Sequence, residues 1–150
     1  MTNKLLNDEV IGQVSEVFDG LNEPVQVLYF GLASDCDFCD DTQQLVQEVV
    51  DISDKLTLEV YDLDEDADIA EQYKIDKAHG MVIAGLDGDQ VLDYGIRFAG
   101  IPSGHEFSSL VNTLVLVSSR DSGLNEETRR VLKDLTQPVQ MMVFVTPTCP

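Results

Sequence analysis

Two kinds of hydrophobic spacing alternate between residues 24 and 118, and their order limits the folds open to this chain. Segments typical of strands occur at 25–30, 55–64, 81–85 and 90–95. Apolar residues at helical spacing occur at about 37–51, 67–75 and 104–118. Asp87-Gly88 predicts a tight hairpin between the last two strands, because this pair supplies the positive φ angles of a two-residue turn. The predicted order is strand, helix, strand, helix, strand, strand, helix.

This order, β-α-β followed by β-β-α, is that of a thioredoxin-like fold, an α/β architecture with a central mixed sheet flanked by helices. A further helix should precede it, capped by Asn7 or Asp8 and ending near Gly20. We therefore predict that residues 1–120 form one thioredoxin-like unit with a leading helix.

An internal repeat suggests that a second unit begins near the end of the chain. Residues 138–149, "PVQMMVFVTPTC", resemble residues 24–36, "PVQVLYFGLASDC", and follow a short helix predicted at about 124–135. We predict that residues 121–150 comprise this connecting helix and the first strand of a second, truncated thioredoxin-like unit. A parallel central strand needs neighbours and a crossover helix, so we also expect further residues after Pro150 in the encoded protein.

The chain is strongly acidic, with 28 acidic residues against 9 basic ones and a net charge of −19. These charges would repel nucleic-acid phosphates, so we expect no nucleic-acid partner. They indicate either adaptation to a high-salt cytoplasm or an ordinary acidic protein. The sequence has neither a membrane-length apolar run nor a signal-peptide pattern, so we expect a soluble, cytoplasmic protein that binds no membrane.

The segment "DCDFCDD" (35–41) places Cys36 and Cys39 in a Cys-x-x-Cys pair where a predicted strand leads into a helix. Unpaired N–H groups and the helix dipole stabilise a thiolate at such a position. We predict that Cys36, at the helix start, attacks a substrate disulfide, and that Cys39, one turn inside the helix, resolves the mixed disulfide. No organic cofactor is predicted.

Other uses of the pair remain open. The two cysteines could be buried structural residues of a non-catalytic thioredoxin-fold binding module. They could also bind a metal ion or an iron–sulfur cluster. A closed zinc site takes four ligands, and the remaining candidates, His79, His105 and Cys149, have no partner at close ligand spacing. We therefore predict no complete metal site.

Several segments together resemble the glutaredoxin-like protein disulfide oxidoreductases of archaea and some thermophilic bacteria. They are "DCDFCDDTQQLVQEVVDISDKL", "YKIDKA", "YGIRFAGIPSGHEF" and "VFVTPTCP". That family carries two thioredoxin-fold units in tandem, each with a Cys-x-x-Cys pair. The resemblance implies thiol–disulfide exchange at Cys36 and Cys39, and Cys149 as the first cysteine of a second, incomplete site. The partners would be disulfide-bearing proteins and an electron-donating reductase.

One position departs from the family pattern. The family places a cis-proline near its cysteine pair, whereas this chain has Ala78-His79-Gly80 at the possible substrate-contacting edge. A cis bond before a residue other than proline costs roughly 3 kcal/mol, so we expect the 78–79 bond to be trans. His79 either acts as an acid, a base, an ion-pair partner or a third metal ligand, or marks a site that has drifted. His105 is expected to have only a structural role at a helix start.

The carboxylates of "DCDFCDD" oppose a thiolate at Cys36. We therefore predict a pKa for Cys36 near the free value of about 8.5, and a reducing rather than a strongly oxidising cysteine pair.

Overall fold

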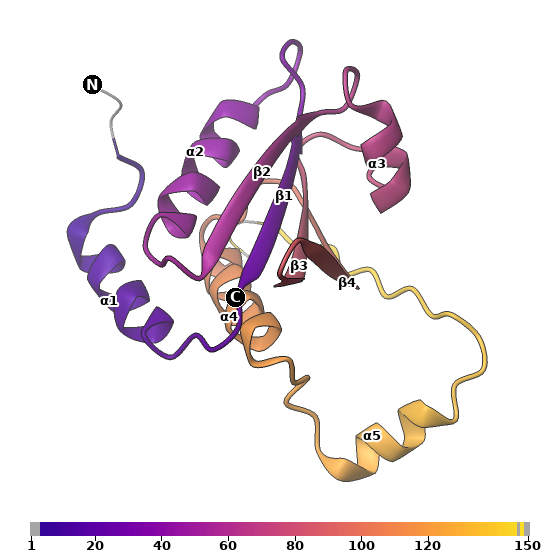
Figure 1. Ribbon diagram of the computed structural model, residues 1–150. Helices are drawn as coiled ribbons and strands as arrows, with labels where there is room; N and C mark the ends of the chain where they lie inside the picture. The colour runs from indigo at the N-terminus through magenta and orange to yellow at the C-terminus, as the bar shows by residue number, and fades with distance from the viewer. Residues whose placement is uncertain (1–3, 147, 149–150) are drawn as a thin grey trace.

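A computed structural model describes residues 4–146 and residue 148, and Figure 1 shows its arrangement around one sheet. The sheet has the strand order β2-β1-β3-β4. β1 pairs in parallel with β2 and antiparallel with β3, and β3 pairs antiparallel with β4. The strands are β1 (Val25–Gly31), β2 (Leu56–Asp62), β3 (Gly80–Asp87) and β4 (Gln90–Ala99). The predicted mixed sheet is confirmed.

Helices cover both faces of this sheet. The covering helices are α1 (Asp8–Phe18), α2 (Cys39–Val50), α3 (Ala67–Tyr73) and α4 (His105–Ser119), whereas α5 (Glu126–Lys133) lies apart from the sheet. Side chains of alternate β1 residues point to opposite faces, as a strand requires. Val27 and Tyr29 belong to the core formed with α1, α2 and α4, whereas Leu28 and Phe30 belong to a smaller core formed with α3. All seven residues of β1 are buried because helices cover it on both sides.

The hairpin between β3 and β4 forms as predicted, but its turn lies one residue further along. Asp87 pairs with Gln90, so Gly88 and Asp89 are the two turn residues instead of Asp87 and Gly88. Gly88 adopts the positive φ of 59° that a glycine tolerates best.

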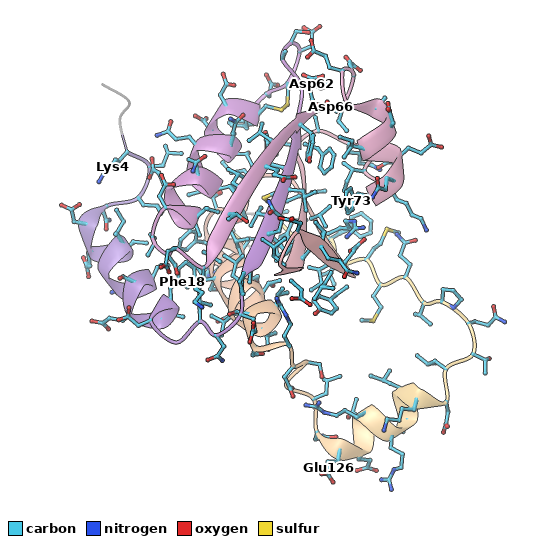
Figure 2. All side chains as sticks on the ribbon, in the orientation of Figure 1. Lys4, Phe18, Asp62, Asp66, Tyr73 and Glu126 are labelled. Carbon is cyan, nitrogen blue, oxygen red and sulfur yellow. A yellow bond between two sulfur atoms is a disulfide. The ribbon has the colours of Figure 1, made fainter. Side chains whose placement is uncertain are left out.

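The C-terminal part of the chain contains the predicted helix but no strand among the residues that the structure describes. α5 buries none of its side chains, and residues 136–146 have no regular secondary structure. The strand predicted from the repeat is therefore not formed here, because these residues enter no ladder with a described strand. Figure 1 shows this segment (yellow) leaving α5 in a wide loop that returns toward β4, and residues 136–146 are all exposed. Figure 2 shows the side chains near Glu126 pointing into open space. The assignment of residues 121–150 to a second unit stays a prediction.

Within the described part of the chain, no helix combines the length and the apolar character needed to cross a membrane.

Candidate active site

Cys36 and Cys39 form a disulfide in the loop that joins β1 to α2, with their Cα atoms 5.6 Å apart. The helix was predicted to begin at about residue 37, but it begins at Cys39. Phe38 has a left-handed backbone with φ of 66°, which cannot be part of a right-handed helix. Cys36 therefore lies ahead of the helix, and Cys39 is its first residue.

The two sulfur-bearing residues differ in exposure. Cys39 is buried, with 4% of its surface exposed, whereas Cys36 is only half-buried. A substrate can therefore approach the Cys36 side of the disulfide more easily than the Cys39 side.

Tyr29 lies under the cysteine pair and was not predicted as a site residue. Its hydroxyl donates a hydrogen bond of 2.7 Å to the backbone oxygen of Cys39. Burial, and to a lesser extent the negative charge of Asp40, raises the pKa of Tyr29 to about 12. The phenol is therefore protonated at physiological pH and remains a donor that ties β1 to the start of α2.

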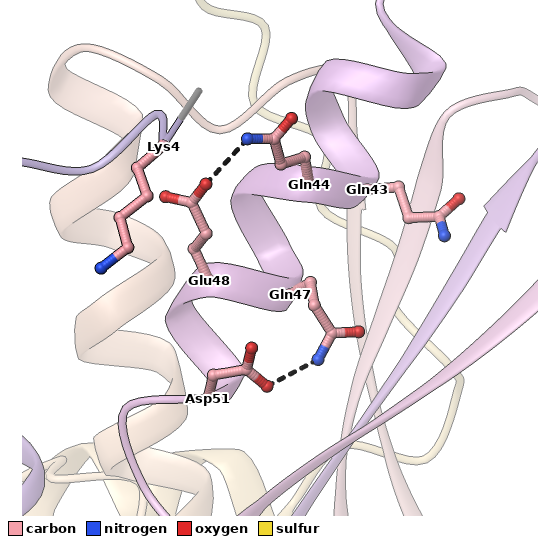
Figure 3. Close-up of a pocket in the computed structure, with 6 residues that line it drawn as sticks. All are labelled: Lys4, Gln43, Gln44, Gln47, Glu48 and Asp51. Atoms are coloured by element: carbon pink, nitrogen blue, oxygen red, sulfur yellow. Dashed lines mark hydrogen bonds between the residues drawn. The ribbon is translucent and has the colours of Figure 1, made fainter. Parts of the chain in front are cut away.

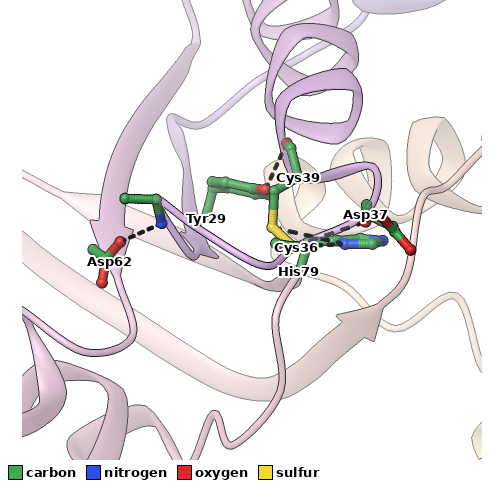
Figure 4. The surroundings of a disulfide bond; sticks show 7 residues. Tyr29, Cys36, Asp37, Cys39, Asp62 and His79 are labelled. Atoms are coloured by element: carbon green, nitrogen blue, oxygen red, sulfur yellow. Dashed lines mark hydrogen bonds between the residues drawn. A yellow bond between two sulfur atoms is a disulfide. The ribbon is translucent and has the colours of Figure 1, made fainter.

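His79 lies directly beside both sulfur atoms, as Figure 4 shows. Its Nδ1 atom is 3.8 Å from the Cys36 sulfur and 4.0 Å from the Cys39 sulfur. Burial lowers the pKa of His79 below its ordinary value, so the imidazole is mostly neutral at neutral pH. The residue that replaces the family's proline is thus close enough to act on either cysteine.

The prediction that the Ala78–His79 bond is trans is wrong, because the structure has it cis. The sheet holds the backbone that follows this bond: the carbonyl of His79 accepts a hydrogen bond from the Gly100 N–H, and Gly80 pairs with both Phe30 and Ala99. His105 begins α4, as the sequence predicted, and its side chain is exposed.

Asp62 anchors the loop that leads to Cys36, and no local sequence signal identified it. One carboxylate oxygen accepts a hydrogen bond from the Ala33 N–H at 2.8 Å, and the other accepts from the N–H groups of Asp64 and Glu65 (Figure 4). These bonds lower the pKa of Asp62. The end of β2 is thereby joined to the loop after β1.

The acidic residues around the cysteines are exposed. Asp35, Asp37, Asp40 and Asp41 all lie at the surface, where water and salt weaken their effect on a thiolate. Cys149 lies outside the described residues.

Two shallow hollows flank α2. One, of about 330 Å³, lies beside Cys39 and is bordered by Tyr29, Asp62 and further acidic side chains. The other, shown in Figure 3, is lined by Lys4 and by polar side chains of α2, away from the cysteines. There Glu48 accepts hydrogen bonds from the N–H groups of Leu5 and Leu6, which hold the N-terminal segment against α2.

Solved structures with this fold include redox proteins. A protein disulfide oxidoreductase from Aeropyrum pernix is 29% identical, with a TM-score of 0.83 over 96% of this chain and 61% of its own. A domain of the alkylhydroperoxide reductase AhpF from Enterococcus faecalis is 30% identical, with a TM-score of 0.73 over 83% of this chain and 58% of its own. These similarities confirm the thioredoxin-like fold and the predicted resemblance to protein disulfide oxidoreductases.

Among curated proteins, the AhpF component of alkyl hydroperoxide reductase in Pseudomonas aeruginosa is 24% identical over 145 residues. The match covers 97% of this chain, which spans a quarter (25%) of the length of that relative. No model of a known protein family matches the chain.

Proposed function

We propose that this chain, a thioredoxin-fold protein similar to protein disulfide oxidoreductases, exchanges disulfides with protein substrates through the Cys36/Cys39 dithiol. The observation that carries the proposal is the disulfide between an accessible Cys36 and a buried Cys39 at a strand-to-helix junction of this fold. Such an asymmetric pair suits a first nucleophile and a second, protected one.

The exchange takes place in two substitutions at sulfur. The Cys36 thiolate attacks a substrate disulfide, forms a mixed disulfide and releases one substrate thiolate, which takes up a proton. The Cys39 thiolate then attacks the Cys36 sulfur and releases the second substrate thiolate. The substrate gains two electrons, and the chain is left with the Cys36–Cys39 disulfide seen in the structure. An electron-donating reductase returns the pair to the dithiol.

His79 is the group placed to accept protons during this cycle. With its ring proton on Nε2, the Nδ1 atom faces both sulfurs and can take the proton from either thiol. His79 borders the disulfide, and we assign residues 78–80 to the edge that contacts the substrate chain.

The partners in this proposal are disulfide-bearing proteins and a reductase, in a cytoplasm where thiols are kept reduced. The similarity to AhpF, a component of alkyl hydroperoxide reductase, supports a partner of the redox class. The acidic surface disfavours binding to nucleic acid or to anionic membranes.

Reduction of insulin by the chain, with dithiothreitol as electron donor, tests the proposal. All variants carry Cys149→Ser so that the Cys36/Cys39 pair is measured alone. We expect this background to reduce insulin, Cys36→Ser to be inactive, and Cys39→Ser to accumulate a mixed disulfide with the substrate. A background protein that is inactive even in high salt, yet still forms the Cys36–Cys39 disulfide, would contradict the proposal and favour a non-catalytic binding module.

The role of His79 is tested in the same assay with two matched variants. His79→Asn should slow exchange by about a hundredfold or more, because it removes a proton acceptor beside the sulfurs. His105→Asn, which changes an exposed histidine at the start of α4, should not. If the two variants exchange disulfides at equal rates at every pH, His79 takes no part in proton transfer.

A further inference from the structure

Three side chains of the kind that bind transition metals meet at the disulfide. The Cys36 sulfur, the Cys39 sulfur and a ring nitrogen of His79 all lie within 4.8 Å of one another. In the described part of the chain, this is the one group of three or more His, Cys, Asp or Glu side chains at such separations. His79 is 43 residues from Cys36 in sequence, so the three side chains come together only when the chain folds.

The separations approach those of a zinc site. Zinc binds thiolate sulfur at about 2.3 Å and imidazole nitrogen at about 2.0 to 2.1 Å in a tetrahedral arrangement, which places sulfur about 3.6 Å from nitrogen. The observed distances from Nδ1 of His79 are 3.8 Å to the Cys36 sulfur and 4.0 Å to the Cys39 sulfur. Once the disulfide is reduced, the two sulfur atoms must move apart to about 3.8 Å, their separation in a tetrahedral zinc site, and a small shift of each toward His79 would then bring all three donors onto one ion.

We propose that the reduced form of this chain binds one zinc ion through the sulfur atoms of Cys36 and Cys39 and the Nδ1 atom of His79. Reduction by dithiothreitol, or by the partner reductase, delivers two electrons and two protons and converts the disulfide into two thiols. Zinc then replaces both thiol protons, which pass to solvent. The proposal requires only a reducible cysteine pair and does not rest on exchange activity toward proteins.

The carboxylates near the cysteine pair disfavour free thiolates but do not disfavour the zinc complex. Asp35, Asp37, Asp40 and Asp41 flank the pair in the sequence, and their negative charges oppose the charge of a free thiolate. Exchanging two protons for one zinc ion leaves the charge of the site unchanged, so the same carboxylates do not oppose the zinc complex. An acidic setting that weakens thiolate formation is therefore compatible with zinc binding.

The site supplies three ligands and leaves the fourth position to water or to a small solvent ligand, because no other His, Cys, Asp or Glu of the described residues joins the group. Three protein ligands plus water is the arrangement of open zinc sites. Cys36 and His79 are only half-buried, so an ion has access from solvent. The zinc-bound and disulfide forms exclude each other, because both use the same sulfur atoms.

Cobalt replaces zinc as a coloured probe in the test. The chain, carrying Cys149→Ser to remove the third thiol, is reduced, freed of reductant and titrated with Co²⁺ without oxygen. We expect one equivalent to bind, with sulfur-to-cobalt charge-transfer absorption and the visible bands of a tetrahedral ion, and zinc to displace it. The oxidised chain should show neither the charge-transfer absorption nor the visible bands of tetrahedral cobalt.

Variants of the three proposed ligands, with one control, assign the site. His79→Asn should weaken Co²⁺ binding at least about tenfold. Loss of a residue that only hydrogen-bonds to a metal ligand already lowers metal affinity by about that factor, and loss of a ligand should cost no less. Cys36→Ser and Cys39→Ser should each weaken Co²⁺ binding and lower the charge-transfer absorption, and the two changes together should abolish it. The matched control His105→Asn should bind like the background. The proposal is overturned if the reduced chain binds no Co²⁺, or if His79→Asn binds it with unchanged affinity and spectrum. A brown protein that contains labile sulfide after anaerobic purification would also overturn it, in favour of an iron–sulfur cluster.

Discussion

Tyr29 shows how a single buried side chain supports the site. Its ring occupies the space beside Gly31, where a Cβ atom would lie 2.9 Å from the ring carbon Cε1. Its hydroxyl reaches the backbone of Cys39 at the first residue of α2. The absence of a side chain at Gly31 therefore allows the ring to lie where it can hold the residue that bears the buried sulfur.

Replacing Tyr29 with phenylalanine removes this hydrogen bond and keeps the ring. We expect the free energy of unfolding to fall by about 1 kcal/mol, the typical net contribution of one hydrogen bond. Urea denaturation of the oxidised protein measures it. Tyr94→Phe is the control, because Tyr94 is 52% exposed and should change stability little. Equal stabilities of the two variants would show that the Tyr29 hydroxyl does not stabilise the fold.

Two helices carry the same cap but differ in packing. The Asn7 side chain accepts a hydrogen bond of 2.8 Å from the Val10 N–H at the start of α1, and Asn125 accepts one of 2.8 Å from the Thr128 N–H at the start of α5. α1 buries Val14 and Phe18 against the core, whereas α5 buries no residue. The contribution of each cap to the stability of the whole domain should therefore differ.

Alanine at each of these two caps tests this difference. We expect Asn7→Ala to lower the free energy of unfolding of the domain by about 1 kcal/mol, because frayed α1 loses its core contacts. Asn125→Ala should reduce helix content measured by circular dichroism but leave that free energy nearly unchanged. A similar loss of stability in both variants would mean that α5 unfolds together with the sheet.

At the scale of the whole molecule, the negative charge is largely uncompensated. The described residues form three ion pairs, Lys77–Asp76, Arg97–Asp93 and Arg129–Asp121. The chain as a whole carries 28 acidic residues. Folding gathers these charges into a small volume, where they repel one another.

Salt should stabilise this fold by screening that repulsion. We expect the free energy of unfolding in urea to rise by about 1 kcal/mol or more between roughly 0.01 M and 1 M sodium chloride, as the Debye length falls from about 30 Å to about 3 Å. Sucrose at matched osmolality separates screening from general solvent exclusion. A stability that stays flat or falls as sodium chloride is added would contradict this prediction and the high-salt interpretation of the charge.

Periodicity and motif spacing in the sequence were enough to predict β1, the hairpin, α1 and α4, and to assign the cysteine pair to a strand-to-helix junction. These features are local: the apolar spacing of a segment and its caps depend on residues only a few positions apart. Local patterns do not include the left-handed Phe38, which moves the start of α2 to Cys39. The repeat at 138–149 predicted a strand, but residues 136–146 form none, because a strand also needs a partner strand to pair with.

The chemistry of the site depended on contacts that only the tertiary structure determines. Antiparallel pairing of β1 with β3 brings the segment before Gly80 beside the loop after Gly31. That pairing puts the imidazole of His79 against both sulfur atoms, across 43 residues of chain. The sequence alone identified a Cys-x-x-Cys pair and an unexpected histidine. Their distance could be known only after folding, because it depends on strand register and packing between distant segments and not on the composition of either one.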